Sequence, residues 1–347
     1  MLKARSQNLR IEPLMVRHLI SLKQPIPSPL QGSLQSYLMK GWIAELESAL
    51  KGFLPAKQPR CLIALENNIP ICFVISKPNN RKGTCWLIEI PISIGSSCLY
   101  SSIQIKKLLV QQLIQQKGNK IQNWIVDCPV MDTEHISLFR ELGFQPLKIY
   151  KSWSSNYSQN ELKTLHINNL KWEKLNRDNA SLLFKIEQSS ESVHLRQILD
   201  RQNIDLLSNN KNIGGVLLSQ NDSNKVAIAG LVHRNNNENE FTFELLREFT
   251  WDQRLEGSIP KLIKYIYTNH PKVKILTNSD DEKLNNVLLK SGCIQNREDI
   301  LLGRSIWKRK QKSTLIKGTK SLDELISSLN PRHPPLPTPT PDQISEN

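Results

Sequence analysis

Two glutamates in apolar runs have the residue type and setting that suit acid–base chemistry. Glu89 lies in the run Trp86–Ile90, and Glu244 lies in the run Phe241–Leu245. A glutamate buried in an apolar strand has a raised pKa, which suits a general base. Successive side chains alternate between the two faces of a strand, so each glutamate could equally point to solvent. Both interpretations stay open.

The other chemistry-bearing residues form no familiar site. His135 and His194 are isolated in the sequence, and no two of the six cysteines have the C-x-x-C spacing of a zinc site. No nucleophile elbow, P-loop, zinc-protease or dinucleotide-binding motif is present. We therefore expect reduced, buried thiols and no metal site.

The first half of the chain alternates apolar runs with helical patterns, which indicates a mixed α/β arrangement. The expected elements are a β-hairpin at 61–65 and 69–76, strands at 86–94 and 123–128, a helix after 103 and a helix after Asp132. Asp132 is a helix N-cap residue, and Gly143 suits the end of that helix.

The second half repeats this order of elements. The expected elements are a hairpin at 215–219 and 225–233, strands at 240–249 and 273–277, a helix from 259, and a helix that begins near Asp281 and ends at Gly292. The spacing from strand to closing glycine is 19 residues in both halves, from Trp124 to Gly143 and from Val273 to Gly292. We therefore predict two copies of one unit.

The polar stretch Ser152–Asn168 marks the joint between the copies. The predicted organisation is domain 1 at 1–155 (copy one), domain 2 at 165–310 (copy two), a short amphipathic helix at 311–330 and a proline-rich, disordered tail at 331–347. The tail has six prolines within 331–341, which favours an extended or disordered chain.

The closing segment of each unit resembles the GNAT superfamily of N-acetyltransferases. Residues Asp132–Phe144 are similar to the family's closing helix, which ends in Leu-Tyr-x-x-x-Gly-Phe, and Asp281–Cys293 is a weaker version. The resemblance covers roughly 8–310. It implies an α/β (mixed α+β) fold class with two GNAT-like domains, each a mixed central sheet flanked by helices.

The resemblance also implies a loop of the type Arg/Gln-x-x-Gly-x-Gly/Ala, whose amides cradle the pyrophosphate of an acyl-CoA. The aligned segment of copy two is Arg254–Ile259, where Arg254 and Gly257 match and Ile259 departs from the pattern. The cofactor-binding candidates in this loop are Arg254, Gly257, Ser258 and Ile259. In copy one only Ser101 and Ser102 are candidates, because its loop lacks the arginine and both glycines.

The family often uses a glutamate base and a tyrosine that protonates the leaving thiolate. Glu89 and Glu244 are the candidate bases here. The tyrosine position of the closing helix is Phe139 in copy one and Leu288 in copy two, and neither can donate a proton.

The resemblance implies an acyl-CoA-dependent N-acyltransferase, with acetyl-CoA as the expected acyl donor and an amine of unknown identity as acceptor. The alternative is a catalytically silent tandem protein that binds an acidic protein or RNA. The chain carries a net charge of +14, concentrated in its first half, and such a surface attracts anionic partners. No apolar stretch is long enough to cross a membrane, so we expect a cytoplasmic protein with no membrane partner.

Overall fold

The computed structural model describes one compact unit that ends at Ile306. The described residues are 9–15, 18, 59–95, 97, 100–115, 121–155, 170–209, 214–221, 224–237, 240–270 and 273–306. The predicted helix at 311–330, the predicted tail at 331–347 and most of the joint between the copies lie outside these residues. The domain boundaries at 155 and 165 therefore stay a prediction.

Copy one has the predicted order of elements. They are β1 (Leu9–Pro13), β2 (Arg60–Glu66), β3 (Ile69–Pro78), β4 (Cys85–Ile88), β5 (Ile92–Ser93), α3 (Ser102–Gln115), β6 (Asn123–Pro129), α4 (Thr133–Glu141) and β7 (Gln145–Ser154). The single strand predicted at 86–94 is instead two strands separated by Glu89–Pro91. Pro91 has no N–H to donate to a neighbouring strand, so it favours this interruption.

Copy two repeats the order, and three helices lie between its first strand and its hairpin. Its elements are β8 (Leu170–Lys174), α5 (Ala180–Ser190), α6 (Val193–Leu199), α7 (Asn203–Asn209), β9 (Gly215–Asn221), β10 (Asn224–Asn237), β11 (Glu240–Arg247), α8 (Arg254–Asn269), β12 (Val273–Asn278), α9 (Glu282–Lys290) and β13 (Ile294–Ser305). In both copies the strand that follows the hairpin pairs in parallel with the strand after the next helix. These pairs are β4 with β6 and β11 with β12.

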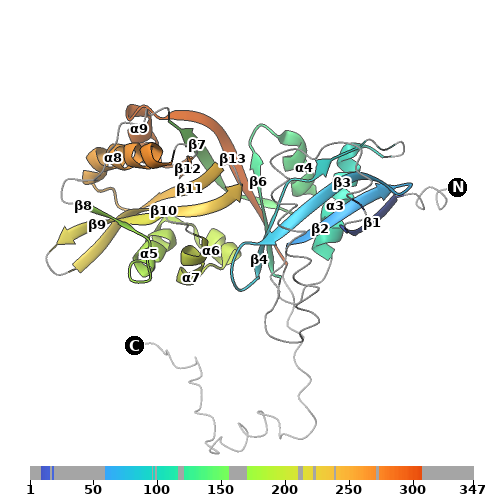
Figure 1. Cartoon of the computed structure of the whole chain (residues 1–347), viewed down its shortest axis with the longest axis horizontal. Helices are drawn as coiled ribbons and strands as arrows, with labels where there is room; N and C mark the ends of the chain where they lie inside the picture. The colour runs from blue at the N-terminus through green and yellow to red at the C-terminus, as the bar shows by residue number, and fades with distance from the viewer. Residues whose placement is uncertain are drawn as a thin grey trace, which may run out of the picture. The chain divides into compact units, whose positions relative to one another are not determined.

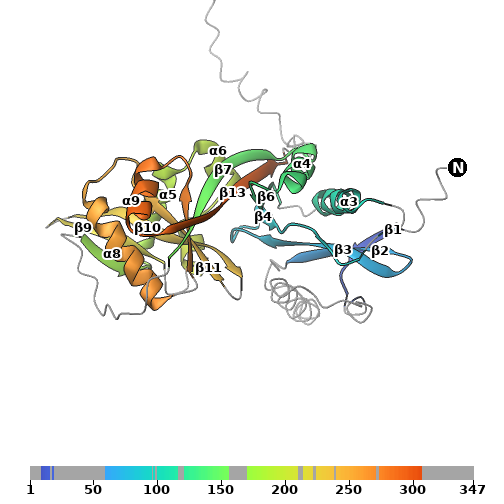
Figure 2. The same ribbon diagram turned by 90° about the horizontal axis from the view of Figure 1, so that it is seen from above.

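All of these strands belong to one mixed sheet, and its centre joins the two copies (Figure 1). The order is β1-β2-β3-β4-β6-β13-β7-β12-β11-β10-β9-β8, with β5 paired to β3. The last strand of each copy thus lies inside the other: β13 separates β6 from β7, and β7 separates β13 from β12. Figure 2 shows β7 and β13 side by side between the two halves.

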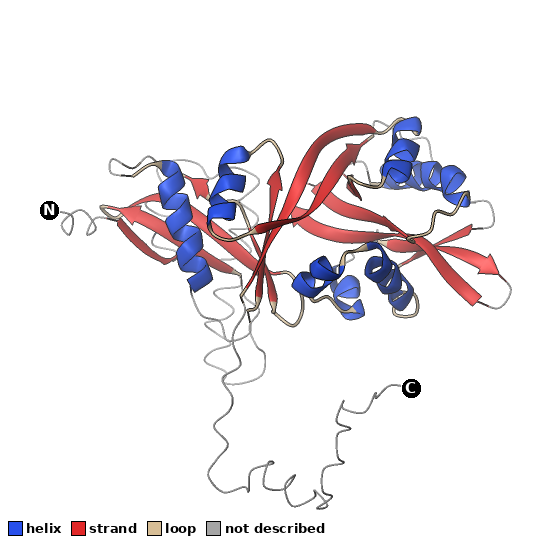
Figure 3. Cartoon of the chain, turned by 180° about the vertical axis from the view of Figure 1, so that it is seen from behind, coloured by secondary structure: helices blue, strands red, loops and turns tan. Residues whose placement is uncertain are grey.

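Helices cover both faces of the copy-two half of the sheet (Figure 3). One core packs α8 and α9 on one face and includes Trp153 of copy one. On the opposite face, α5 packs on β9–β11 and α6 packs on the central strands. Tyr150 of copy one is buried in the core beneath α6, which contains residues of both copies, so β7 contributes to a core on each face of the sheet.

Local signals in the sequence placed the closing helices correctly. Asp132 caps α4 by accepting a hydrogen bond from the His135 amide, and Asp281 does the same for Leu284 at α9. Gly143 and Gly292 follow these helices with φ of +84° and +79°, which glycine adopts without strain. Among the described helices, none is long and apolar enough to span a membrane.

Candidate active site

The parallel strands β11 and β12 part near their ends, and a pocket of about 170 Å³ lies where they separate. Their last paired residues are Glu244 and Leu276. The pocket is lined by Lys148, Ser190, Leu245–Phe249, Asn278, Asp280 and Asp281. We call this pocket the cleft. It contains the edge of β11 beyond its last contact with β12, so backbone groups there are available to a ligand.

Strand β7 brings Lys148 of copy one to the cleft. β7 runs antiparallel to β12, and the Ser279 amide donates to the Ile149 carbonyl at 2.9 Å, which holds β7 against the end of β12. The Lys148 side chain is 6% exposed and donates to Glu191 at 2.5 Å and to Glu244 at 2.7 Å. The cleft is therefore built from both copies.

A buried charge cluster lies behind the cleft wall. It consists of Lys148, Glu191, Glu244 and Arg234, and the Arg234 guanidinium meets Glu244 at 2.7 Å. We call these four residues the charge cluster. The cations also lie over the ring of Tyr150, with Lys148 at 4.9 Å and Arg234 at 4.6 Å from its centroid.

The two carboxylates of the charge cluster have opposite electrostatic settings. Burial alone would raise the pKa of Glu244, but the positive charges of Arg234 and Lys148 hold it well below its usual range. Burial and the charge of Glu244 together raise the pKa of Glu191 to about 7, although Lys148 lies against it. Burial opposes the charge on Lys148, but Glu244 and Glu191 raise the pKa of Lys148 and keep it protonated.

These contacts place Glu244 beside the cleft, yet they favour a fixed anion over a base. A carboxylate with a lowered pKa takes up a proton only weakly. Glu191, which the sequence analysis did not single out, has the pKa closer to neutrality. Its one sequence signal is its position just after a helix, which by itself points to no chemistry.

The predicted base Glu89 lies in a different setting. It follows β4, its side chain is 17% exposed, and it forms an ion pair with Lys77 at 3.0 Å. The structure does not bring Glu89 and Glu244 together. Glu89 follows β4 of copy one, and Glu244 lies in β11, the equivalent strand of copy two.

The predicted loop of copy two lies within the first turns of α8. Arg254 opens the helix, and its guanidinium pairs with Asp252 at 2.7 Å and donates to Ser219 at 2.9 Å. The Asp252 carboxylate also accepts the Arg254 amide at 2.9 Å, so it occupies the helix N-terminus. A phosphate at this position would have to displace that carboxylate.

The remaining candidates of this loop are helical. Ser258 is buried and donates to the Arg254 carbonyl, and Ile259 is buried in the core beneath α8. Gly257 has no atom within 4 Å of the place where a β-carbon would lie.

The predicted serines of copy one cap their own helix. Ser101 and Gln104 exchange hydrogen bonds between side chain and amide at 3.2 and 3.4 Å, which is a capping box at the start of α3. The Ser102 hydroxyl lies 2.8 Å from that of Ser93. These contacts occupy the Ser101 and Gln104 amides and the Ser102 hydroxyl, which are the groups that would otherwise be available to bind an anion.

The two positions of the missing tyrosine belong to the core. Phe139 is fully buried and meets Phe144 edge-on at 5.2 Å, and Leu288 is buried under α8 and α9. His135 links Asp132 at 2.7 Å to Lys106 at 3.0 Å, whereas His194 is exposed on α6.

A second pocket, of about 570 Å³, lies between the start of α8 and α9; we call it the helix pocket. Its lining is Trp251, Gln253, Glu256, Pro260, Lys283, Asn286, Val287, Lys290 and Ser291. Arg247 and Lys283 lie over the Trp251 ring at 5.2 and 5.8 Å. Arg247, which lines the cleft, pairs with Asp281 through two hydrogen bonds of 2.6 and 2.9 Å. The cleft and the helix pocket therefore meet at Arg247 and Trp251.

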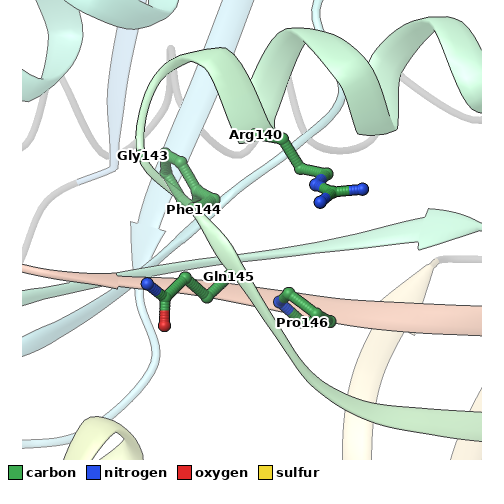
Figure 4. Close-up of a pocket in the computed structure, with 5 residues that line it drawn as sticks. All are labelled: Arg140, Gly143, Phe144, Gln145 and Pro146. Atoms are coloured by element: carbon green, nitrogen blue, oxygen red, sulfur yellow. The ribbon is translucent and has the colours of Figure 1, made fainter.

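A third pocket, of about 460 Å³, lies where α4 turns into β7 (Figure 4). Its lining consists of Arg140 and the segment Gly143–Pro146. Nearby, Arg304 donates to the Leu142 carbonyl at 2.6 Å and so caps the C-terminal end of α4. This lining has one charged side chain, that of Arg140, and no carboxylate or imidazole that could act as a base. It therefore offers less chemistry than the cleft.

Comparison with known proteins finds structures of similar fold and no similar sequences. No protein-family model and no curated protein sequence matches the chain. The structure is similar to a GCN5-related N-acetyltransferase from Sphaerobacter thermophilus, with a TM-score of 0.51 and 8% identity over 87% of this chain and 97% of that one. It is also similar to a glucosamine N-acetyltransferase region of a fungal multi-domain β-N-acetylglucosaminidase, with a TM-score of 0.52 and 10% identity over 85% of this chain and 38% of that one. Taken with the order of its strands and helices, this similarity shows that the chain has the fold of the GNAT superfamily.

Proposed function

We propose that this protein is an acyl-CoA-dependent N-acyltransferase, that acetyl-CoA is its acyl donor, and that the cleft of copy two is its active site. The observation that supports this most is the parting of β11 and β12 beside a buried charge cluster. The identity of the amine acceptor is left open.

The edge of β11 at Leu245–Arg247 suits the extended, amide-containing arm of an acyl-CoA. These residues pair with β10 on one side, and their pairing with β12 ends at Glu244. An extended chain with amide groups adds to such an edge through backbone hydrogen bonds. The thioester would then lie in the cleft near Lys148.

The helix pocket suits the nucleotide end of the same molecule. Lys283 and Lys290 line this pocket and offer charges for phosphates, and Arg247 adds a further positive charge over the Trp251 ring. The predicted role of Arg254, Gly257, Ser258 and Ile259 in phosphate binding is less favoured, because Asp252 already occupies the start of α8. We therefore propose Lys283 and Lys290 as the main phosphate contacts.

The reaction needs a neutral amine to attack the thioester carbonyl. The C–N bond forms, the C–S bond breaks, and the thiolate departs while the attacking nitrogen loses a proton to water at the mouth of the cleft. The residues of the chain orient the two substrates and stabilise the charge that develops on oxygen and sulfur.

Calorimetric titration with acetyl-CoA tests this proposal. Wild type should bind one acetyl-CoA in copy two, and Lys283→Glu with Lys290→Glu should weaken binding at least tenfold, because each lost phosphate contact and each added repulsion has a cost. Lys264→Glu is the matched control, since Lys264 is exposed on α8 and is not part of the helix pocket lining. Absence of binding by folded wild type at millimolar acetyl-CoA would refute the proposal.

A further inference from the structure

Two cations line the cleft and could stabilise a departing thiolate. The nitrogen-bearing side chains of the cleft lining are those of Lys148, Arg247 and Asn278. Arg247 is held by Asp281 through two bonds and also donates to the carbonyls of Glu248 and Phe249. Asn278 is uncharged. Lys148 is paired as well, with Glu191 and Glu244. Its partner Glu244 is the last residue of β11 that pairs with β12, so Lys148 is the cation held where the two strands part.

Lys148 comes from copy one, whereas the rest of the cleft lining comes from copy two. It lies on β7, which the strand exchange inserts between β12 and β13. We propose that Lys148 is a catalytic residue of the copy-two site, where its ammonium group stabilises the negative charge on the leaving sulfur, and that Glu191 sets the strength of that field. This inference rests on the proposed function.

Glu191 decides the net charge of the cluster. Lys148 and Arg234 are cationic, and Glu244 is anionic. When Glu191 is ionised the four groups sum to zero, and when it is protonated they sum to one positive charge. A net positive charge stabilises a thiolate more than a neutral cluster does, especially where protein replaces water.

The elements packed around the charge cluster contribute other charged side chains. They are Glu187 of α5, Arg201 after α6, Asp127 of β6, Asp299 of β13, and Arg247, Glu248, Asp280 and Asp281 at the cleft. Arg201 pairs with Glu187 at 2.7 Å, Arg297 pairs with Asp299 at 2.9 Å, and Arg247 pairs with Asp281. These three pairs are each neutral, and Asp127, Glu248 and Asp280 lie outside them. Burial also raises the pKa of Asp127. Glu191 is the group with a raised pKa that contacts Lys148 directly.

The pKa of the thiol of bound CoA tests the inference without knowledge of the acceptor. It is measured on the full chain as thiolate absorbance against pH, after calorimetry has shown that CoA is bound. In Glu191→Gln the cluster keeps one positive charge at every pH. We expect the pKa of the CoA thiol to be lower there than in wild type.

Replacing Lys148 should raise the pKa of the bound CoA thiol. Lys148→Met alone leaves two carboxylates against Arg234 and could fail to fold, because an unpaired buried charge is costly. The double variant Lys148→Met with Glu191→Gln removes one cation and one anion and keeps the Arg234–Glu244 pair. We expect its thiol pKa to be at least one pH unit above that of Glu191→Gln, with CoA affinity within about threefold.

Matched controls separate this inference from the proposed function. Lys151→Met removes another lysine of β7 that is not in the cleft lining, and it should leave the thiol pKa unchanged. Lys148→Arg with Glu191→Gln should keep the pKa low, because the charge is retained. If CoA binds and the Lys148 variants share one thiol pKa, this inference is overturned and the proposed function stands. If wild type binds no CoA, both are overturned.

Discussion

Individual buried side chains connect the two copies. Trp153 of copy one donates to Thr277 of copy two at 2.7 Å, and Thr277 donates to Asn285 at 2.6 Å. Tyr267 donates to the Trp153 carbonyl at 3.0 Å. All four residues are buried, so each polar group depends on its partner for its hydrogen bond.

Thr277→Val should destabilise the protein by about 2–4 kcal/mol. Valine keeps the volume but leaves the Trp153 indole N–H and the Asn285 carbonyl oxygen without their present partner, and each such group costs about 1–3 kcal/mol. Thr277→Ser retains the hydroxyl and is the control, with a smaller loss. Urea unfolding measures both. Equal stability of Val and wild type would show that this chain of bonds is not needed.

Glu191→Gln should gain stability relative to wild type as pH rises. The folded pKa of Glu191, about 7, is above its unfolded value, so between about pH 4.3 and 7 the folded state holds a proton that the unfolded chain has lost. The carboxyl therefore costs stability as pH rises through that window. The variant should gain about 2–3 kcal/mol over wild type between pH 5 and pH 8. A pH-independent difference would contradict the raised pKa.

Residue-level prediction succeeded where the signal was local and failed where it was not. Asp132, Gly143 and Gly292 act within their own helix ends, so their neighbours in sequence reveal them. Glu244 has its partner Lys148 nearly a hundred positions away, in the other copy. No pattern in either segment indicates that contact.

At the scale of elements, the repeated order was predictable and the strand exchange was not. Hairpins and closing helices have turn and cap signals. β7 and β13 were not predicted, because their mixed polar and apolar residues give only weak strand patterns. β7 and β13 pair with each other although they lie far apart in the sequence. Hydrophobic periodicity indicates the type of a local element and does not indicate which strands pair. The extension of α8 to Arg254 was also missed, because a glycine within a helix resembles a loop residue.

Two glycines should respond oppositely to alanine. A β-carbon at Gly215 of β9 would lie 2.5 Å from the Glu173 carbonyl oxygen and 2.5 Å from the Trp172 ring, so Gly215→Ala must push β8 away. Gly257 lies in α8 with open space around it, and alanine there should stabilise the helix by up to about 1 kcal/mol. Thermal unfolding distinguishes the two. A destabilising Gly257→Ala would mean that the start of α8 is not helical.

At the scale of the whole described unit, the two copies share their central strands. β6 pairs with β13, and β12 pairs with β7, so a separated copy would expose unpaired strand edges at its centre. The predicted partner, an acidic protein or RNA, was inferred from overall charge and stays a prediction.

Expressed separately, residues 1–160 and 161–347 should each be aggregated or unfolded, and co-expression should yield one soluble complex. Each half lacks the strand that the other supplies to its sheet. Size-exclusion chromatography and circular dichroism report the outcome. Two independently folded, non-associating halves would contradict the strand exchange.

An acyl-CoA bound in the copy-two cleft should protect the backbone that lines the cleft. Amide hydrogen exchange of the full chain with and without acetyl-CoA measures this protection and locates the ligand on the backbone. We expect slower exchange at 245–249 and at 278, 280 and 281, which line the cleft, and little change at the equivalent segment 89–95 of copy one. Unchanged exchange at 245–249 and at 278, 280 and 281 under saturating acetyl-CoA, or protection confined to copy one, would contradict acyl-CoA binding in the cleft.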